Sequence, residues 1–473
     1  MTIIFKASWN GYEQGTVQNL GSTEEARLIA AGIAAAHTAT AAQRIRGDAV
    51  VNDVGQVVVR NDAAGGQVVV GGGDNVSRLS SFEIPRACQG HWALPNCLNI
   101  DGGNKAYVGY AGEDGEYGVA LVDFVAGSIK SVVIDKAESD DHNVPSFCLT
   151  TGAKNVIAAY ATHSLRPVMH VAPDAFAGAA EFRGRQPVTG SDIVTYNQIH
   201  KSIGADGVPW LYLFYRTGNS DTGRWNVRVS KTDGATWEAE VPLIDAEYIY
   251  TALNGSGTSI RIYAYEHPIV GTDHDIFYCQ LDTVSGNLTL PGSVTVANSN
   301  IYTVGSALPM ATSALMKAVD ITAGTSRLFN AAGPSAGTVP ALLACEFDSA
   351  GSATNGAYYR YVYASAGALF TKKLICQSGG PFFQGSSWYY PGVCFAHGSQ
   401  DTVYVCRREG STYYLDKMVT TDAGNTWTTT NLVTSQNRLV RPTHLQSGYV
   451  VYTEFSRYDA YTDFDATLKF VQG

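Results

Sequence analysis

After residue 81, apolar residues come in short runs that glycine-rich or polar turns separate. Many of these runs carry aromatic residues at alternate positions, as in residues 106–110, 211–215 and 402–405. Short apolar runs bounded by turn residues, and enriched in tyrosine and valine, are typical of β-strands. The pattern therefore predicts that this part of the chain is all-β.

The predicted strands recur in similar units, each with an opening turn, a strand, a glycine turn and an aromatic-rich second strand. Six opening turns with their second strands are 92–95 with 106–110, 142–145 with 157–160, 196–198 with 211–216, 250–252 with 261–265, 390–392 with 402–405, and 441–443 with 449–452. A longer unit over 305–375 is the seventh. Units of about 55 residues match four-stranded blades. We predict a seven-bladed β-propeller over 81–473, with a large β-sandwich or two barrels as the alternative.

The first 80 residues follow a different pattern. Residues 22–32 predict a helix, with a capping Ser or Thr, glutamates in the first turn and a glycine stop. Two short strands precede it, so residues 1–45 are expected to form a small α+β module. Residues 46–80 alternate valine triplets with glycine clusters, which favours a linker or a short β stalk.

Composition narrows the functional classes. The net charge is −10 and no block of basic residues occurs, so nucleic acid is not an expected partner. We expect no signal peptide and no membrane insertion, because no apolar stretch is long enough. None of the eight cysteines forms a CxxC pair, which excludes a zinc ribbon. We expect most of them to be buried, reduced thiols.

Two segments match the Asp-box turn, whose pattern is Ser/Thr-x-Asp-x-Gly-x-Thr-Trp. Residues 420–427 match it in full, and residues 230–237 match it with one residue fewer between Asp and Gly. In such a turn the carboxylate binds turn amides, glycine supplies a positive φ and the tryptophan packs on the blade. We assign Asp233, Trp237, Asp422 and Trp427 to this structural role. Two such boxes favour a sialidase-like propeller.

Four polar residues occupy equivalent places in two successive units. His142 and Tyr196 open their units, and His163 and Arg216 follow the second strands. Adjacent blades would bring all four to one face. The set suits β-elimination at a uronic acid, because arginine pairs with the carboxylate while His or Tyr takes and returns protons. This chemistry requires no cofactor, and the residues leave open which group is the base.

From about residue 85 onward the chain resembles the seven-bladed polysaccharide lyases of the ulvan-lyase type and the BNR-repeat group around them. The resemblance lies in residues 141–145, 160–163, 195–198 and 214–216 and in the box that ends at Trp237. It implies that His142, His163, Tyr196 and Arg216 surround the cleaved linkage. By position, we add Asn143, Arg441 and Tyr458 as substrate-binding residues.

The same resemblance implies a structural zinc in some members, held by His and Cys. His267, His274 and Cys279 are the candidates in this chain. The alternative is that the two histidines lie in turns and that Cys279 is a buried thiol.

Residues 1–45 resemble the first segments of tailed-phage virion proteins, through Trp9-Asn10-Gly11-Tyr12, Gly15 and the helix pattern that follows. This implies an anchor to phage capsid or tail proteins. We therefore expect a virion protein, assembled in the host cytoplasm and acting outside it, that binds and cleaves an acidic host-surface polysaccharide. One alternative is a glycan-binding receptor or capsid-decoration protein without turnover. A second, suggested by the Asp boxes alone, is a sialidase-like glycoside hydrolase.

Overall fold

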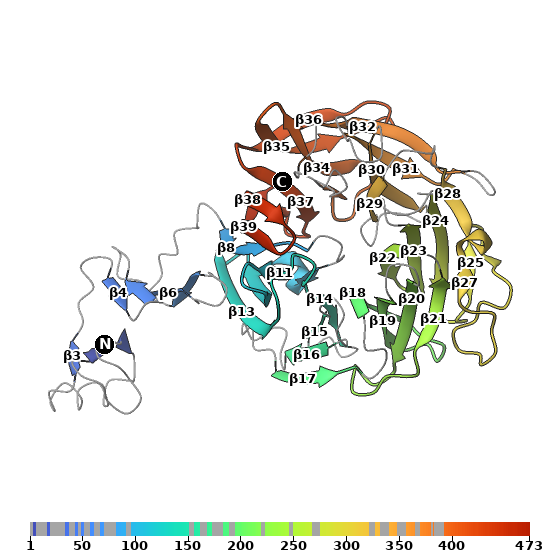
Figure 1. The fold of residues 1–473 in the computed structure, drawn as a ribbon, viewed down its shortest axis with the longest axis horizontal. Coiled ribbons are helices and arrows are strands. Elements are labelled where there is room, and N and C mark those ends of the chain that lie inside the picture. Colours follow the sequence, from blue (N-terminus) through green and yellow to red (C-terminus); the bar gives the residue numbers. More distant parts are fainter. Residues whose placement is uncertain are drawn as a thin grey trace.

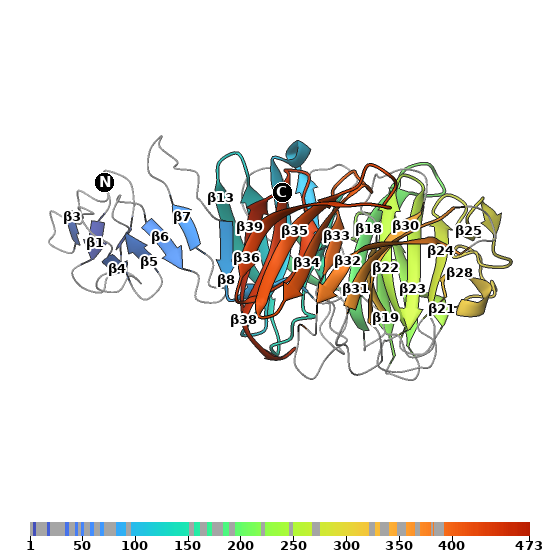
Figure 2. The ribbon, with the colours of Figure 1, turned by 90° about the horizontal axis from the view of Figure 1, so that it is seen from above.

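A computed structural model shows the chain as a ring of β-sheets with a smaller N-terminal part beside it (Figure 1). The structure describes residues 82–90, 96–150, 156–160, 194–218, 223–245, 257–265, 275–320, 340–346, 356–364, 369–379 and 392–473, with a few single residues between these ranges. For several further strands only the backbone pairing is described. The sheets stand around a central axis, so the fold is a β-propeller, as predicted (Figures 1 and 2).

Antiparallel pairing of neighbouring strands builds the sheets around the ring. The first contains β10 (Cys97–Ile100), β11 (Lys105–Gly112), β12 (Glu116–Asp123) and β13 (Ser128–Lys136), with β9 (Ala87–Cys88) on β11 and the 3₁₀ turn η1 (Asp101–Gly103) after β10. The second contains β14 (Ser146–Leu149), β15 (Val156–Tyr160), β16 (Val168–Ala172) and β17 (Arg183–Pro187). The third contains β18 (Val194–Ile203), β19 (Pro209–Thr217), β20 (Arg224–Ser230) and β21 (Val241–Asp245), with β27 (Met310–Ala311) parallel to β21.

The next sheets follow the same order of strands. The fourth contains β22 (Ile249–Ser256), β23 (Ser259–Glu266), β24 (Ile276–Asp282), β25 (Leu288–Leu290) and β26 (Val294–Thr295), with β28 (Met316–Val319) on β24 after the 3₁₀ turn η2 (Thr312–Ala314). The fifth contains β29 (Arg327–Ala331), β30 (Ala341–Phe347), β31 (Gly356–Val362) and β32 (Thr371–Gly379). The sixth contains β33 (Val393–Phe395), β34 (Thr402–Glu409), β35 (Thr412–Val419) and β36 (Thr428–Ser435).

A composite sheet closes the ring. It joins β37 (Arg438–His444), β38 (Tyr449–Ala460) and β39 (Asp463–Gln472) near the C-terminus to β8 (Phe82–Pro85), in the order β37-β38-β39-β8. Phe82 pairs with Phe470, and Ile84 with Leu468. Pairing of this kind ties the first strand of the propeller segment to its last, so backbone hydrogen bonds close the ring.

The prediction of seven successive units needs correction. In the described part of the propeller segment, six sheets are built on consecutive strands, and the closing sheet draws on both ends of the segment. The predicted long unit over 305–375 is also divided, because β27 and β28 complete the third and fourth sheets and a new sheet starts at β29. Residues 196–198, 250–252 and 441–443 are not turns; they lie inside β18, β22 and β37.

The N-terminal part contains two small sheets. One has the order β2 (Val17–Gln18), β1 (Ile3–Phe5), β3 (Ala34–Ala36), and the other joins β4 (Gln43–Ile45), β5 (Ala49–Val51), β6 (Val57–Arg60) and β7 (Gln67–Val70). Because β4 pairs with β5, the second sheet crosses the predicted boundary at residue 45. The predicted helix over 22–32 lies outside the described residues. No helix in the described part is long and apolar enough to span a membrane.

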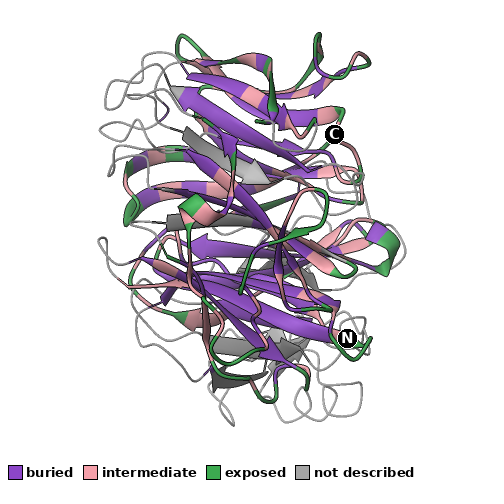
Figure 3. Ribbon diagram, turned by 90° about the vertical axis from the view of Figure 1, so that its right-hand side faces the viewer, coloured by how far each residue is buried: buried purple, intermediate pink, exposed green. Residues whose placement is uncertain are grey.

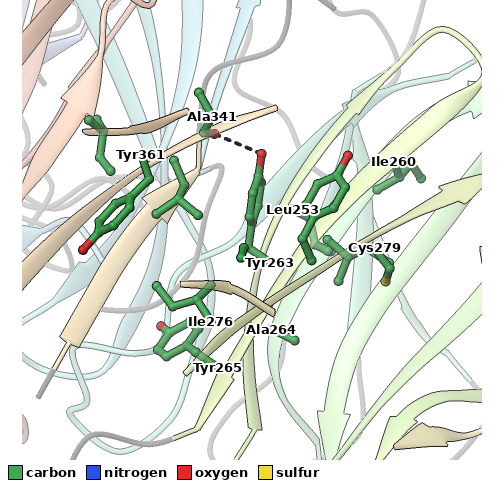
Figure 4. Close-up of a cluster of buried hydrophobic side chains, with 14 of the residues drawn as sticks. Leu253, Ile260, Tyr263, Ala264, Tyr265, Ile276, Cys279, Ala341 and Tyr361 are labelled. Carbon is green, nitrogen blue, oxygen red and sulfur yellow. Dashed lines mark hydrogen bonds between the residues drawn. The ribbon is translucent and has the colours of Figure 1, made fainter. Parts of the chain in front are cut away.

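The core of the propeller lies between neighbouring sheets, where strand residues are buried on both faces (Figure 3). Its largest buried side chains are mostly tyrosines, such as Tyr263. The Tyr263 hydroxyl donates a 3.0 Å hydrogen bond to the backbone oxygen of Ala341 in the next sheet (Figure 4). A buried phenol needs such a partner. Tyrosine therefore packs adjacent blades and links them at the same time, which accounts for its abundance.

The Asp-box turn at 420–427 has the expected geometry. Asp422 Oδ1 accepts hydrogen bonds from the backbone N–H groups of Asn425 and Thr426, at 3.0 and 2.9 Å. Gly424 has a φ of 89°. The indole of Trp427 donates to the backbone oxygen of Leu374 in the preceding sheet, at 3.1 Å. At the other box Asp233 has a φ of 52°, and Trp237 packs against a cluster that residues of the second and third sheets form together.

Candidate functional site

The turn between β13 and β14 fixes the position of His142. The Asp140 carboxylate accepts the backbone N–H of His142 at 2.8 Å, and the imidazole Nδ1 lies 2.5 Å from the same oxygen. Nδ1 is also 3.1 Å from Asp141 Oδ1. The backbone N–H of Asp141 donates to the Tyr461 oxygen, in the turn between β38 and β39, at 2.9 Å. The closing sheet therefore helps to hold this turn.

A buried ion pair also holds the turn between β13 and β14 in place. Arg441 Nη2 lies 2.6 Å from Asp141 Oδ2, and the two side chains are 4% and 0% exposed. The Tyr458 hydroxyl donates to the same oxygen at 2.9 Å. A second guanidinium nitrogen of Arg441 donates to the backbone oxygen of Gln89 at 2.6 Å. Asp141 thus has partners from β37 and β38, about 300 residues further along the chain.

Two β-bulges shape the site, one in the first strand of the third sheet and one in the first strand of the closing sheet. The register of β18 shifts between Thr195 and Gln198, and that of β37 shifts between Val440 and Thr443. Within these bulges Tyr196 and Arg441 have φ values of 60° and 56°. Bulky side chains rarely adopt this left-handed conformation, and a bulge turns a side chain out of the strand's alternation. Such strain collects at functional sites.

Tyr196 lies close to both a histidine and an arginine. The ring centroids of His142 and Tyr196 are 5.9 Å apart, and the Arg216 guanidinium carbon is 4.7 Å from the Tyr196 ring centroid. That distance is within the range of a cation–π contact. The Tyr461 ring packs edge-on against the imidazole at 5.5 Å. The second sheet, the third sheet and the closing sheet each contribute to this cluster, which we call the His142 cluster (His142, Tyr196, Arg216 and Tyr461).

The carboxylates control the charge of the imidazole. Burial alone would lower the pKa of His142, but the hydrogen bonds to Asp140 and Asp141 outweigh it and raise this pKa to about 9. The Arg441 guanidinium is equally buried, and Asp141 raises its pKa further. At neutral pH the His142 imidazolium, which is paired with Asp140 and Asp141, and the Arg216 guanidinium both lie next to the Tyr196 phenol.

The structure brings three of the four predicted catalytic residues together: His142, Tyr196 and Arg216. The fourth, His163, lies outside the described residues. The predicted substrate-binding residues Arg441 and Tyr458 are buried and hold Asp141, so their geometry favours a positioning role over direct contact with a glycan. The Asn143 amide is also buried and donates to the Glu138 backbone oxygen at 3.1 Å.

The predicted zinc ligands are only partly described. His267 and His274 lie outside the described residues, whereas Cys279 lies in the apolar core between two sheets (Figure 4). Burial raises the pKa of Cys279 to about 12, which keeps it a thiol rather than the thiolate that binds zinc. The set remains a prediction.

Among the described residues, one group of side chains has the composition of a metal site, namely Asp140, Asp141 and His142. Their possible ligand atoms lie within 4.8 Å of one another. A protonated imidazole has no lone pair for a metal, and Asp141 already pairs with Arg441. The geometry of these three side chains therefore favours an internal network of ion pairs over a metal site.

Sequence reasoning assigned no role to Asp140, Asp141, Gln89 or Tyr461. For the two aspartates a signal was present, because they directly precede His142 and a carboxylate next to a histidine sets its charge and orientation. Gln89 and Tyr461 reach the site only through the closure of the ring, and no local pattern marks them.

The fold is a β-propeller with Asp-box turns, and comparison with known proteins agrees with this fold. The model of the BNR repeat-containing family matches residues 105–373, so this chain belongs to that family. No curated protein matches it.

Among solved structures, the chain is similar to a polysaccharide lyase described as PL25-Ulvanlyase, bound to a GlcA(1-4)Rha3S saccharide. The two share 13% identity over 85% of this chain and 96% of that one, with a TM-score of 0.58. A second structure described as PL25-Ulvanlyase matches at 12% identity with the same coverage and TM-score. At this level of identity the likeness concerns the fold.

Proposed function

We propose that this protein binds an acidic polysaccharide and cleaves it by β-elimination at a uronic acid. The observation that carries the proposal is the His142 cluster, in which an imidazolium and a guanidinium each lie next to the Tyr196 phenol. Two cations at one position suit a sugar carboxylate, which arginine can bind through two parallel hydrogen bonds. The structurally similar lyase bound to a GlcA-containing saccharide supports the same substrate class.

The cluster suggests a division of roles in the reaction. Arg216 and the His142 imidazolium bind the uronate carboxylate and stabilise the negative charge that develops when the C5 proton leaves. Because His142 is already protonated, the base among the described residues is the Tyr196 phenolate. The C5–H electrons form the C4=C5 double bond and the C4–O bond breaks. The leaving oxygen takes a proton from the Tyr196 phenol.

The direct test is absorbance near 235 nm, where the unsaturated uronate product absorbs, with a panel of uronic-acid glycans. We expect Tyr196→Phe and Arg216→Lys each to lower the rate at least about 100-fold, the usual effect of removing one acid–base or charge-stabilising group. Tyr414→Phe is a matched control, because Arg407 lies 4.4 Å over the Tyr414 ring in a tyrosine–arginine pair of the sixth sheet.

The outcomes separate this function from the others. A product from wild type and the control but not from the two site variants supports the lyase. Glycan binding that persists in His142→Ala, with no product from wild type, would instead identify a glycan-binding protein without turnover. Release of sialic acid would identify a hydrolase.

We further propose that residues 1–45 anchor the protein to phage capsid or tail proteins, and that it works as a virion component in host attachment. The support is the sequence resemblance of this segment to the first segments of virion proteins. The test is mass spectrometry of purified particles. We expect the full chain to copurify with particles in fixed proportion to a capsid protein, and its loss on gradient purification would contradict the proposal.

A further inference from the structure

A cavity of about 400 Å³ lies where the ring closes, between the first sheet and the closing sheet. Its walls come from the turns between β10 and β11, between β12 and β13, and between β37 and β38, and from the end of β39. At this junction β8 pairs with β39, and buried residues of β8, β39 and β11 share one apolar cluster (Figure 1). No proposed step uses this cavity.

The cavity and the His142 cluster lie on opposite faces of the propeller. The cavity follows the ends of the innermost strands β10 and β37. His142 comes just before the innermost strand β14, and Tyr196 lies near the start of β18. The innermost strands of successive blades run in the same direction along the axis. A ligand in the cavity would therefore not compete with a glycan at the cluster.

The lining of the cavity differs in chemistry from the cluster. Every residue that lines the cavity is uncharged. Phe124 and Tyr449 stack at 4.8 Å between ring centroids, and both remain partly exposed. The amide side chains of Asn104, Gln446 and Gln472 also line the cavity and are exposed. Aromatic rings and primary amides without a charge match the C–H faces and the hydroxyl groups of a neutral sugar.

Backbone hydrogen bonds fix the walls of the cavity. The Phe124 N–H donates to the Asn104 oxygen at 2.9 Å, which ties the first two turns together. The Gln446 N–H donates to Asn99 Oδ1 at 2.9 Å and ties the third turn to the first sheet. A cavity formed before the ligand arrives loses less entropy on binding than one that must be assembled.

We propose that this cavity binds an uncharged pyranose ring of a glycan, as a second carbohydrate site that holds the chain without cleaving it. Its volume is within the range of small-molecule sites and exceeds that of one sugar ring. The acidic sugar would bind at the cationic face and the neutral sugar at this one. The proposal goes beyond the lyase function and does not depend on it.

The test is saturation-transfer NMR on the full chain, with methyl β-D-glucopyranoside and methyl α-L-rhamnopyranoside as neutral probes and methyl β-D-glucuronide as the charged comparison. Gln446→Ala removes one exposed amide, and we expect about a fivefold weaker signal, as for one lost neutral hydrogen bond. Val125 is 71% exposed at the cavity edge, so Val125→Trp should block it without disturbing the core.

Two control variants separate this site from the His142 cluster. Gln436→Ala removes an exposed amide from a different turn, and His142→Gln alters the cluster; we expect both to leave the neutral-probe signal unchanged. Saturation transfer to neither neutral probe, or full signal in both cavity variants, would overturn the proposal, as would a stronger signal for the glucuronide that the cavity variants remove. The neutral-probe signal is also measured in His142→Gln protein. Failure of the proposed lyase function would therefore leave this signal unchanged.

Discussion

Replacing Asp140 by asparagine should make His142 easier to deprotonate. The substitution keeps the shape of the side chain and removes the negative charge that lies 2.5 Å from the imidazole Nδ1. The side chains of His142 and Asp140 are 9% and 7% exposed, so solvent screens their interaction little. Burial, which opposes the imidazolium, remains in the variant.

The magnitude follows from the raised pKa. A shift from 6.5 to about 9 corresponds to about 3 kcal/mol in favour of the charged imidazole, at about 1.4 kcal/mol for each pKa unit. Two carboxylates share this effect. Removal of one should lower the pKa of His142 by about one unit or more, or about 1.4 kcal/mol.

The pH dependence of stability has a definite sign. Because the folded pKa lies above the unfolded value, the stabilisation by charged His142 is fully present below pH 6.5 and is lost as the pH rises through about 9. In Asp140→Asn the loss should be complete at a lower pH. Binding of an acidic glycan should weaken over the same range, since the imidazolium is one of the two cations of the cluster.

The assay is a ¹H–¹³C NMR titration of the histidine Cε1–H signals, with the His142 signal assigned by its absence in His142→Gln. Asp245→Asn is the control, because it removes a carboxylate from an exposed pair with Arg224. The reasoning fails if wild-type His142 titrates at or below pH 6.5, or if Asp140→Asn leaves its pKa where it was.

Three other predictions follow from the same structure. Asp141→Asn leaves the buried guanidinium of Arg441 without its carboxylate and should lower the free energy of unfolding by about 3 kcal/mol in urea titrations, against about 0.5 kcal/mol for Asp245→Asn; equal losses would contradict this. Hydrogen bonds from Thr426 and its neighbours lower the pKa of Asp422 to about 2, so its stabilisation is present above pH 3.8 and lost as the pH falls through 2. Thermal melts of Asp422→Ala should therefore depend less on pH between 4 and 2, and an unchanged profile would argue against the turn geometry. Burial holds the pKa of Cys279 near 12, so it should not react with Ellman's reagent until the protein unfolds, and rapid labelling of the native chain at that residue would refute its burial.

Local patterns were enough to find the strands and one of the turns in detail. The aromatic-rich runs at 211–215, 402–405 and 449–452 lie within β19, β34 and β38, because alternation and turn residues act over a few neighbours. The turn at 420–427 binds its own amides through Asp422, so its geometry is also written in adjacent residues. The approach of His142 to Tyr196 and Arg216 followed from equivalent places in neighbouring units.

Features that depend on distant contacts were beyond such reasoning. The pairing of β8 with β39 joins residues almost 400 positions apart, so no local pattern could assign β8 to the last sheet. Segments 196–198 and 441–443 look like turns because they carry polar residues, yet they are bulged strands held by their neighbours.

The amino-acid sequence by itself determined the strands, the turn chemistry and the presence of His142, Tyr196 and Arg216 at comparable positions. Only the tertiary structure decided that His142 carries a charge, because that depends on burial and on two carboxylates, one of which, Asp141, is held by an arginine from the far end of the chain. The pKa of an imidazole reflects the summed field of its surroundings, and those surroundings exist only once the ring has closed.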